Sequence, residues 1–233
     1  MGRAKIKKKS TFIDMTAMSD VTVLLLTFFM LTSTFLQKEP VTVLTPSSVS
    51  ELKVPTANLT TVLISPEGKV FLSISGDADS TYSSEKVRAE VFQTAVAEYN
   101  KTHSKKIEIT PQQVAKFSKL NMFGYRLADL PAFLDKEQFK QDELLSDPEN
   151  QLAGIPVDDN KDLAKPNEFQ IWMRAIYNSS NPNLEQAIKK GEGIAIKADK
   201  DTPYSTVHDV LDNLQTLKMN KFSLMTALKT END

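Results

Sequence analysis

The sequence contains no cysteine, only 7 glycines and only 2 histidines among its 233 residues. Without cysteine, the chain can form no disulfide, zinc–thiolate site or cysteine nucleophile. So few glycines leave little material for a glycine-rich phosphate-binding loop. The charges nearly balance, with 28 Lys and Arg against 30 Asp and Glu, whereas a nucleic-acid-binding domain needs a clear basic excess. These absences argue against thiol chemistry, nucleotide-phosphate loops and nucleic-acid binding.

Long apolar runs are also scarce, and residues 13–36 are almost the only stretch that could cross a membrane. As a helix, this stretch would be about 36 Å long at about 1.5 Å per residue, enough to span a bilayer with some tilt. The residues before it are basic and include Arg3, Lys5, Lys7, Lys8 and Lys9. Positive charge holds a flanking segment in the cytoplasm, so the sequence predicts a single-pass membrane protein whose chain after Leu36 lies on the outer side. A cleaved signal peptide fits less well, because no small-residue cleavage site follows Leu36.

Asp20 lies inside this apolar stretch, where burying its charge costs at least about 2.5–3.5 kcal/mol. An ionisable residue in a membrane span predicts a functional site. At about 100° per residue, Thr16, Thr27 and Thr34 fall along the same helical stripe as Asp20 and form a supporting polar face. The alternative is a helix cap near the cytoplasmic end, a role that Asp14 fills better. Because one helix offers its own carboxylate no partner, we expect it to belong to a larger membrane assembly.

The segment IDMTAMSDVTVLLLTFFMLTSTF resembles the membrane helix of the ExbD/TolR family of biopolymer-transport proteins. Helices of that family share an Ile-Asp-x-Thr-Pro start, an Asp-Val pair and a Leu-rich run that ends in Phe-Phe-Met. Ala17 stands where the family has proline, which should alter a local kink more than the chemistry. Far downstream, residues 194–226 are similar to the family's C-terminal strand, helix and strand.

This resemblance implies that Asp20 carries protons in a motor that uses the proton motive force to energise TonB-dependent transport. The implied partners are an ExbB/TolQ-like proton-channel subunit, a TonB-like protein, a second copy of the chain and membrane lipid. It implies no enzymatic activity, no catalytic or metal-binding residue and no cofactor. A TolR-like envelope-integrity role and a stator role are alternatives within the family. A passive membrane-tethered protein that binds the cell envelope is the alternative outside it.

The expected fold class is α/β, with a single N-terminal transmembrane helix followed by a small periplasmic α/β domain with a mostly helical insertion. Proline and hydroxyl residues after the span indicate an extended linker. The expected organisation is a cytoplasmic tail at 1–12, a transmembrane helix at 13–36, a linker at 37–59 and the α/β domain at 60–233, with the insertion at about 100–166.

Alternating and capped patterns locate the elements of that domain. Strands are expected at 61–64, 69–74, 106–109, 194–198 and 221–226. Helices are expected after Ser84, Thr110, Asn167, Pro182 and the pair Thr202-Pro203, and irregular acidic loops around 142–162.

The chain offers few groups for catalysis. His103 and His208 have no nucleophile or metal-ligand companion nearby in sequence, so we expect both at the surface. Residues 158–162 resemble the first half of a calcium loop but lack the glycine and glutamate at its sixth and twelfth places, which favours a solvated acidic loop. Asp199 and Asp201 follow an expected strand and suit turn or capping roles.

Overall fold

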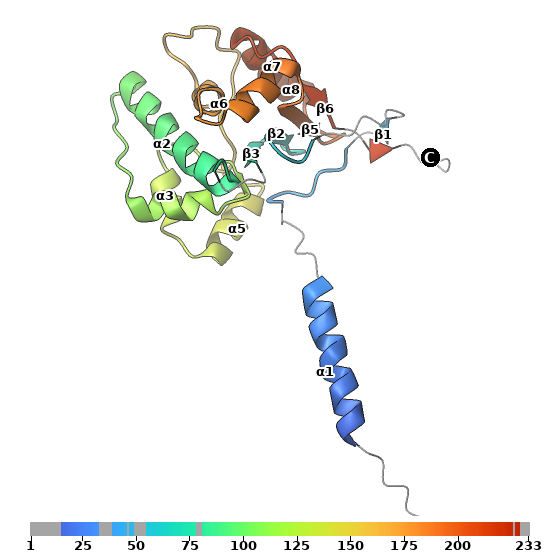
Figure 1. Ribbon diagram of the computed structural model, residues 1–233. Helices are drawn as coiled ribbons and strands as arrows, with labels where there is room; N and C mark the ends of the chain where they lie inside the picture. Colours follow the sequence, from blue (N-terminus) through green and yellow to red (C-terminus); the bar gives the residue numbers. More distant parts are fainter. Residues whose placement is uncertain are drawn as a thin grey trace, which may run out of the picture. The chain divides into compact units, whose positions relative to one another are not determined.

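The computed structural model of the chain divides into two compact units, Met1–Lys38 and Glu39–Asp233. The first unit contains helix α1 (Met15–Thr32), and the second contains every strand and the remaining helices of the described part of the chain (Figure 1). The structure describes residues 15–32, 39–45, 47–48, 55–77, 81–225 and 227–228.

A five-stranded mixed sheet is the centre of the second unit. Its order is β4-β3-β2-β5-β6. Strands β2 and β3 form the expected antiparallel hairpin, whereas β2 pairs with β5, and β5 with β6, in parallel. The strands are β2 (Leu59–Ile64), β3 (Val70–Ser75), β4 (Met122–Phe123), β5 (Ile194–Ala198) and β6 (Ser223–Leu224). Together with the helices, this sheet confirms the expected α/β class.

Helices pack around both ends of the sheet. Figure 1 shows α2, α3 and α5 towards the β3 end, and α7 and α8 towards the β5–β6 end. A separate two-stranded parallel sheet pairs β1 (Ser47–Ser48) with β7 (Ala227–Leu228). The helices of the second unit are α2 (Ser84–Thr102), α3 (Pro111–Ser118), α4 (Leu130–Leu134), α5 (Gln138–Ser146), α6 (Glu168–Tyr177), α7 (Pro182–Lys190) and α8 (Tyr204–Thr216).

Capping residues define several helix ends, and the helices after Thr110 and Asn167 begin where the sequence predicts. Thr110 and Asn167 each form a capping box with the glutamine three residues later, at the starts of α3 and α6. Gly191 ends α7 in the left-handed region, at φ +98°. Glycine is favoured there because it carries no Cβ.

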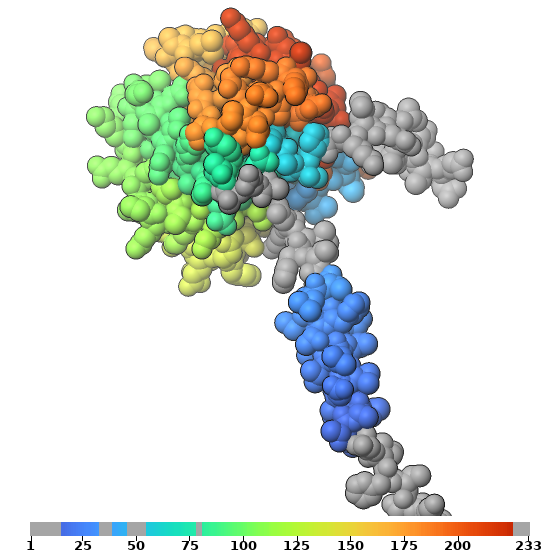
Figure 2. Space-filling view, viewed as in Figure 1, coloured from blue at the N-terminus to red at the C-terminus, as the bar shows by residue number. Residues whose placement is uncertain are grey.

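Four aromatic side chains from distant parts of the chain meet in the core. Phe92 of α2 stacks on Phe117 of α3 at 4.4 Å between ring centroids, and Trp172 of α6 lies 4.7 Å from Phe123 of β4. All four are at most 2% exposed. Phe117 and Phe123 fall within the segment 100–166 that we expected to be an insertion. That segment therefore shares one core with the rest of the domain, and in Figure 2 its green to yellow surface adjoins the surface of the preceding residues without a break.

Several local expectations were wrong. Residues 106–109 form no strand, because the Asn100 side chain satisfies both backbone groups of Ile107, at 2.7 and 2.8 Å. Thr202 does not cap α8; its hydroxyl donates to the Ser65 carbonyl at 3.1 Å, and Pro203 occupies the cap position.

The elements of the insertion and the closing strand also differ from expectation. Helix α5 continues through Ser146, where we expected an acidic loop to have begun. The short edge strand β4 was not expected, and it pairs with β3. The described part of the closing strand, β6, covers only two residues.

Candidate functional site

Helix α1 has the length and polarity of a membrane span. Its 18 residues include no proline or glycine and have a mean hydropathy of 1.6. They would extend about 27 Å at about 1.5 Å per residue. None of these side chains is buried by the chain itself. A lipid bilayer or a partner must therefore cover this apolar surface.

Asp20 lies one and a half turns into α1, and its side chain is exposed. Among the residues that the structure describes, no hydrogen bond or ion pair joins its carboxylate to another group. Asp20 is therefore an acid on an otherwise largely apolar helix, without a partner among the described residues.

The hydroxyl groups of α1 are largely occupied by the helix itself. Ser19 and Thr22 donate to backbone carbonyls four residues earlier, at 2.8 and 2.7 Å. Thr27 donates to the Leu24 carbonyl at 2.9 Å. Such hydroxyls keep their lone pairs free to accept a hydrogen bond from water or from a protonated acid. Thr16 and Thr27 share the helical face of Asp20, as expected from their spacing. Thr34 lies outside the described residues.

The chain between α1 and β2 contacts the α/β domain closely. The backbone N–H of Leu44 donates to Asp199 Oδ2 at 2.6 Å, and Lys200 returns a backbone hydrogen bond to the Leu44 carbonyl at 3.0 Å. Lys197 pairs with Glu39 at 2.7 Å, and Val43 is 8% exposed. We call residues 39–45 the docked segment. It adds specific side-chain contacts to what we expected to be an extended linker.

Asp199 has two structural roles at the end of β5. Its Oδ1 accepts from the Asp201 backbone at 2.9 Å, which is the turn role that the sequence predicted. Its Oδ2 accepts from Leu44 of the docked segment. No sequence pattern indicated this second contact, because the residues are 155 positions apart.

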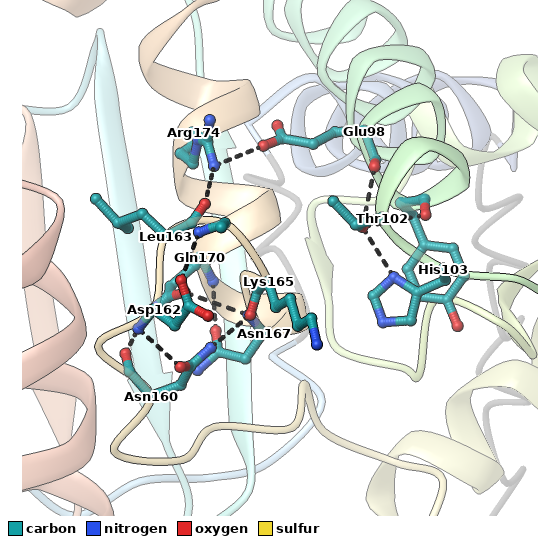
Figure 3. A network of polar contacts seen from close by, with 12 residues as sticks. Glu98, Thr102, His103, Asn160, Asp162, Leu163, Lys165, Asn167, Gln170 and Arg174 are labelled. Carbon is teal, nitrogen blue, oxygen red and sulfur yellow. Dashed lines mark hydrogen bonds and ion pairs between the residues drawn. The ribbon is translucent and has the colours of Figure 1, made fainter.

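The α/β domain contains two glutamates whose pKa is raised by burial. Burial raises the pKa of Glu168, although the Leu127 backbone N–H donates to its carboxylate at 2.7 Å and lowers that pKa in part. Burial also raises the pKa of Glu98, against the effect of Arg174, which it meets at 3.0 Å (Figure 3). Both groups therefore hold a proton more readily than a solvated glutamate.

The acidic run before α6 is bonded to itself. Asp158, Asn160 and Asp162 each accept a backbone N–H two residues later, at 2.9–3.2 Å. Gln170 then donates to the Asn160 carbonyl at 2.6 Å (Figure 3). These bonds explain the alternating acidic and amide residues as turn-forming groups. In the described part of the chain, no three His, Asp or Glu side chains form a cluster that could hold a metal ion.

Both histidines contact neighbouring side chains of their own helix or its end. His208 is half exposed and lies 3.6 Å from Asp212 on the same helix. His103 stacks on Tyr99 at 3.9 Å and contacts the Thr102 hydroxyl at 2.9 Å (Figure 3). The Thr102 hydroxyl also donates to the carbonyls of Glu98 and Tyr99, at 3.1 and 3.2 Å, so its contacts are those of a helix end.

Comparison with protein families identifies the N-terminal half of the chain. The family model described as "Biopolymer transport protein ExbD/TolR" matches residues 7–122. The match includes α1 with Asp20, the β2–β3 hairpin, α2 and α3, and it ends within the segment that we expected to be an insertion. No curated protein and no solved structure matches the chain.

Proposed function

We propose that this chain, which belongs to the ExbD/TolR family, is the proton-carrying subunit of an inner-membrane motor that energises TonB-dependent transport. The observation that carries the proposal is the position of Asp20. It is an ionisable group within an apolar 18-residue helix, and the described part of the chain gives it no partner. Such residues in membrane spans line ion pathways or proton relays.

Asp20 would act as a proton switch because its two charge states prefer different surroundings. Against lipid or apolar side chains, the neutral acid is favoured. Beside a water-filled path, the carboxylate is stable and can release its proton. A change of exposure between these surroundings would couple proton passage to a movement of α1 or of the helices around it.

A channel subunit is needed to provide both surroundings. One helix cannot enclose a water path, so an ExbB/TolQ-like protein would surround α1, with a second copy of this chain as a further component. Thr16 and Thr27 lie on the face of Asp20 and would orient water or accept a hydrogen bond from the protonated acid. The N-terminal basic residues would keep residues 1–12 in the cytoplasm and the α/β domain in the periplasm.

The α/β domain would transmit the movement to a TonB-like protein at the outer membrane. The docked segment supports this role, because hydrogen bonds and an ion pair join the chain that leaves α1 to strand β5 and the turn after it. Movement of α1 would therefore be transmitted to β5 through the contacts of the docked segment.

The test replaces Asp20 with asparagine, which keeps the shape of the side chain but cannot release a proton. We expect Asp20→Asn to remain in the membrane and to co-purify with its channel subunit, while energised transport is lost. Asp20→Glu keeps the acid and should retain part of the transport. Thr27→Val should reduce transport less than Asp20→Asn, because a hydroxyl orients water without carrying the charge.

Protein levels and complex formation are the controls. Each variant is compared at equal abundance, with the channel subunit measured in the same detergent extract. Normal transport by Asp20→Asn under these conditions would disprove the motor function and would favour the passive tether.

A further inference from the structure

A groove lies at the end of the domain formed by α6, α7 and α8. Two neighbouring depressions, of about 250 and 450 Å³, share Tyr177, Leu217, Lys218 and Met219 in their walls. They therefore form one elongated groove, bounded by the last turn of α6, the last turns of α7 and the connection from α8 to β6. We call it the α6–α8 groove.

The floor of the α6–α8 groove is apolar. Ile188 and Met219 are 3% and 5% exposed, and Tyr177 and Leu217 are half-buried against the same core. Tyr177 presents an aromatic ring whose centroid lies 6.0 Å from the ammonium group of Lys189. An elongated apolar surface with an aromatic wall suits the side chains of an extended peptide.

The charged side chains that line the groove are all cationic. They are Arg174, Lys189, Lys218 and Lys221. Arg174 and Lys189 are paired with Glu98 and Glu185. Lys218 and Lys221 have no carboxylate partner in the part of the chain that the structure describes. The groove is thus locally positive in a protein whose formal net charge is −2.

Lys218 has an unfavourable backbone conformation. It follows the end of α8 with φ +62°, in the left-handed region. At the corresponding position after α7 the chain has Gly191, which adopts φ +98° without a Cβ. The Cβ of Lys218 makes this left-handed backbone conformation unfavourable, and glycine would adopt it without that cost. Strained residues of this kind concentrate at functional positions.

Lys221 is held in place by a close backbone approach. A Cβ added to Gly191 would lie 2.9 Å from the Cβ of Lys221 and 3.5 Å from its Cδ. The aliphatic part of Lys221 therefore packs directly on the end of α7. This contact limits the freedom of the lysine before any ligand binds, which reduces the entropy lost on binding.

From these observations we infer that the α6–α8 groove binds an acidic, partly apolar segment of a partner protein in an extended conformation. Apolar side chains of that segment enter the depressions beside Tyr177 and Met219. Its carboxylates pair with Lys218 and Lys221, the two cations that have no partner. This assignment does not depend on the proton-carrying role of Asp20, because the groove lies wholly within the second unit.

The experiment measures binding of a labelled, capped peptide to the full chain purified in detergent, by fluorescence anisotropy. The probe alternates glutamate with leucine and proline over ten positions. A second peptide has lysine in place of every glutamate. We expect saturable binding of the acidic peptide that weakens as salt is raised, and no saturable binding of the basic peptide.

Two pairs of substitutions with the same charge change test the location. Lys218→Gln with Lys221→Gln should weaken binding about five- to tenfold, since each exposed charge pair contributes only modestly. Lys105→Gln with Lys140→Gln removes the same charge from exposed residues outside the groove and should leave the affinity unchanged. Equal effects of the two pairs, or binding of the basic peptide, would overturn the assignment.

Lys218→Gly separates binding from stability. Glycine relieves the left-handed strain, so the midpoint of thermal unfolding should rise while affinity for the acidic peptide falls. Unchanged affinity would show that Lys218 has no role in binding. Binding of anionic phospholipid vesicles without binding of the acidic peptide would also refute the proposal.

Discussion

The backbone N–H of Leu44 donates to the Asp199 carboxylate at 2.6 Å across 155 positions of sequence. Asp199 is only 7% exposed, so water competes weakly for this hydrogen bond. The contact joins the chain that leaves the membrane helix to the turn after β5. It is the most specific link between the docked segment and the α/β domain, because the neighbouring Lys197–Glu39 pair is partly exposed.

Asp199→Ala should release the docked segment. Hydrogen bonds to a charged group contribute about 1.5–3 kcal/mol, and the substitution also removes the bond to the Asp201 backbone. We expect faster amide hydrogen exchange at Leu44 and a loss of stability of that size. Lys197→Ala, which removes only the partly exposed pair with Glu39, should have a smaller effect. Equal exchange at Leu44 in wild type and Asp199→Ala would contradict the structure.

Phe117→Ala should destabilise the whole domain. Phe117 is fully buried and touches the rings of Phe92, Phe123 and Trp172. Truncation of a buried phenylalanine costs about 3–5 kcal/mol. Because 100–166 shares this core, we expect one cooperative unfolding transition at lower denaturant. Phe139→Ala, at a side chain that is 77% exposed, is the matched control and should change stability by less than about 0.5 kcal/mol. Separate transitions for 100–166 and the sheet would show that the segment folds independently.

Arg88→Met should destabilise the domain, because the buried guanidinium of Arg88 joins α2 to β3 and α3. Its guanidinium donates to the carbonyls of Ile74 and Ser118 and to the Asn121 side chain, at 2.9–3.4 Å. Methionine fills similar space but leaves these acceptors without a donor, at a cost of about 1–3 kcal/mol for each buried carbonyl. Urea unfolding measures the loss.

Arg88→Lys is the control for charge. Lysine keeps the positive charge but cannot reach several acceptors with one planar group, so its stability should fall between those of wild type and Arg88→Met. Wild-type stability in Arg88→Met would mean that the hydrogen bonds contribute nothing.

Glu168→Gln should change how stability depends on pH. Burial raises the pKa of Glu168 in the folded protein above its ordinary value of 4.5. Between the ordinary pKa and the raised pKa, the folded state therefore binds more protons than the unfolded state. The stability that Glu168 contributes falls as pH rises through this window. Glutamine stays neutral and its oxygen can still accept from Leu127. Relative to the variant, wild type should lose stability as pH rises from about 4 to neutrality.

The comparison is made by denaturant unfolding at several pH values. A variant with an unchanged pH profile would show that Glu168 titrates normally. Glu137→Gln, at an exposed glutamate, serves as the control and should leave the profile unchanged.

The sequence predicted those elements that local signals define. The hairpin β2–β3 follows from alternation and a turn, and α3, α6 and α7 follow from their caps. Asp20 could be identified because a charge is costly in an apolar span wherever the rest of the chain lies. Such features depend on residues within a few positions of one another.

Other features of the fold follow from no local sequence pattern and were not predictable in the same way. Ile107 has the alternation of a strand, but Asn100 takes both of its backbone hydrogen bonds. The short strand β4 exists because Met122 and Phe123 lie beside β3, not because of their own propensity. Nothing in the sequence around Lys218 indicated a left-handed backbone, which only the structure after α8 shows.

The docked segment also determines where mechanical force would enter the domain. Tension along the chain from α1 meets residues 39–45 before it reaches β2. It must first break the Lys197–Glu39 pair and the hydrogen bonds between Leu44, Asp199 and Lys200. These contacts form a short patch at one end of β5, so a weak pull would be borne there while the central strands stay unloaded. A stronger pull would peel the segment away and shift the load to the pairing of β1 with β7, before it reaches Leu59, the first residue of the central strand.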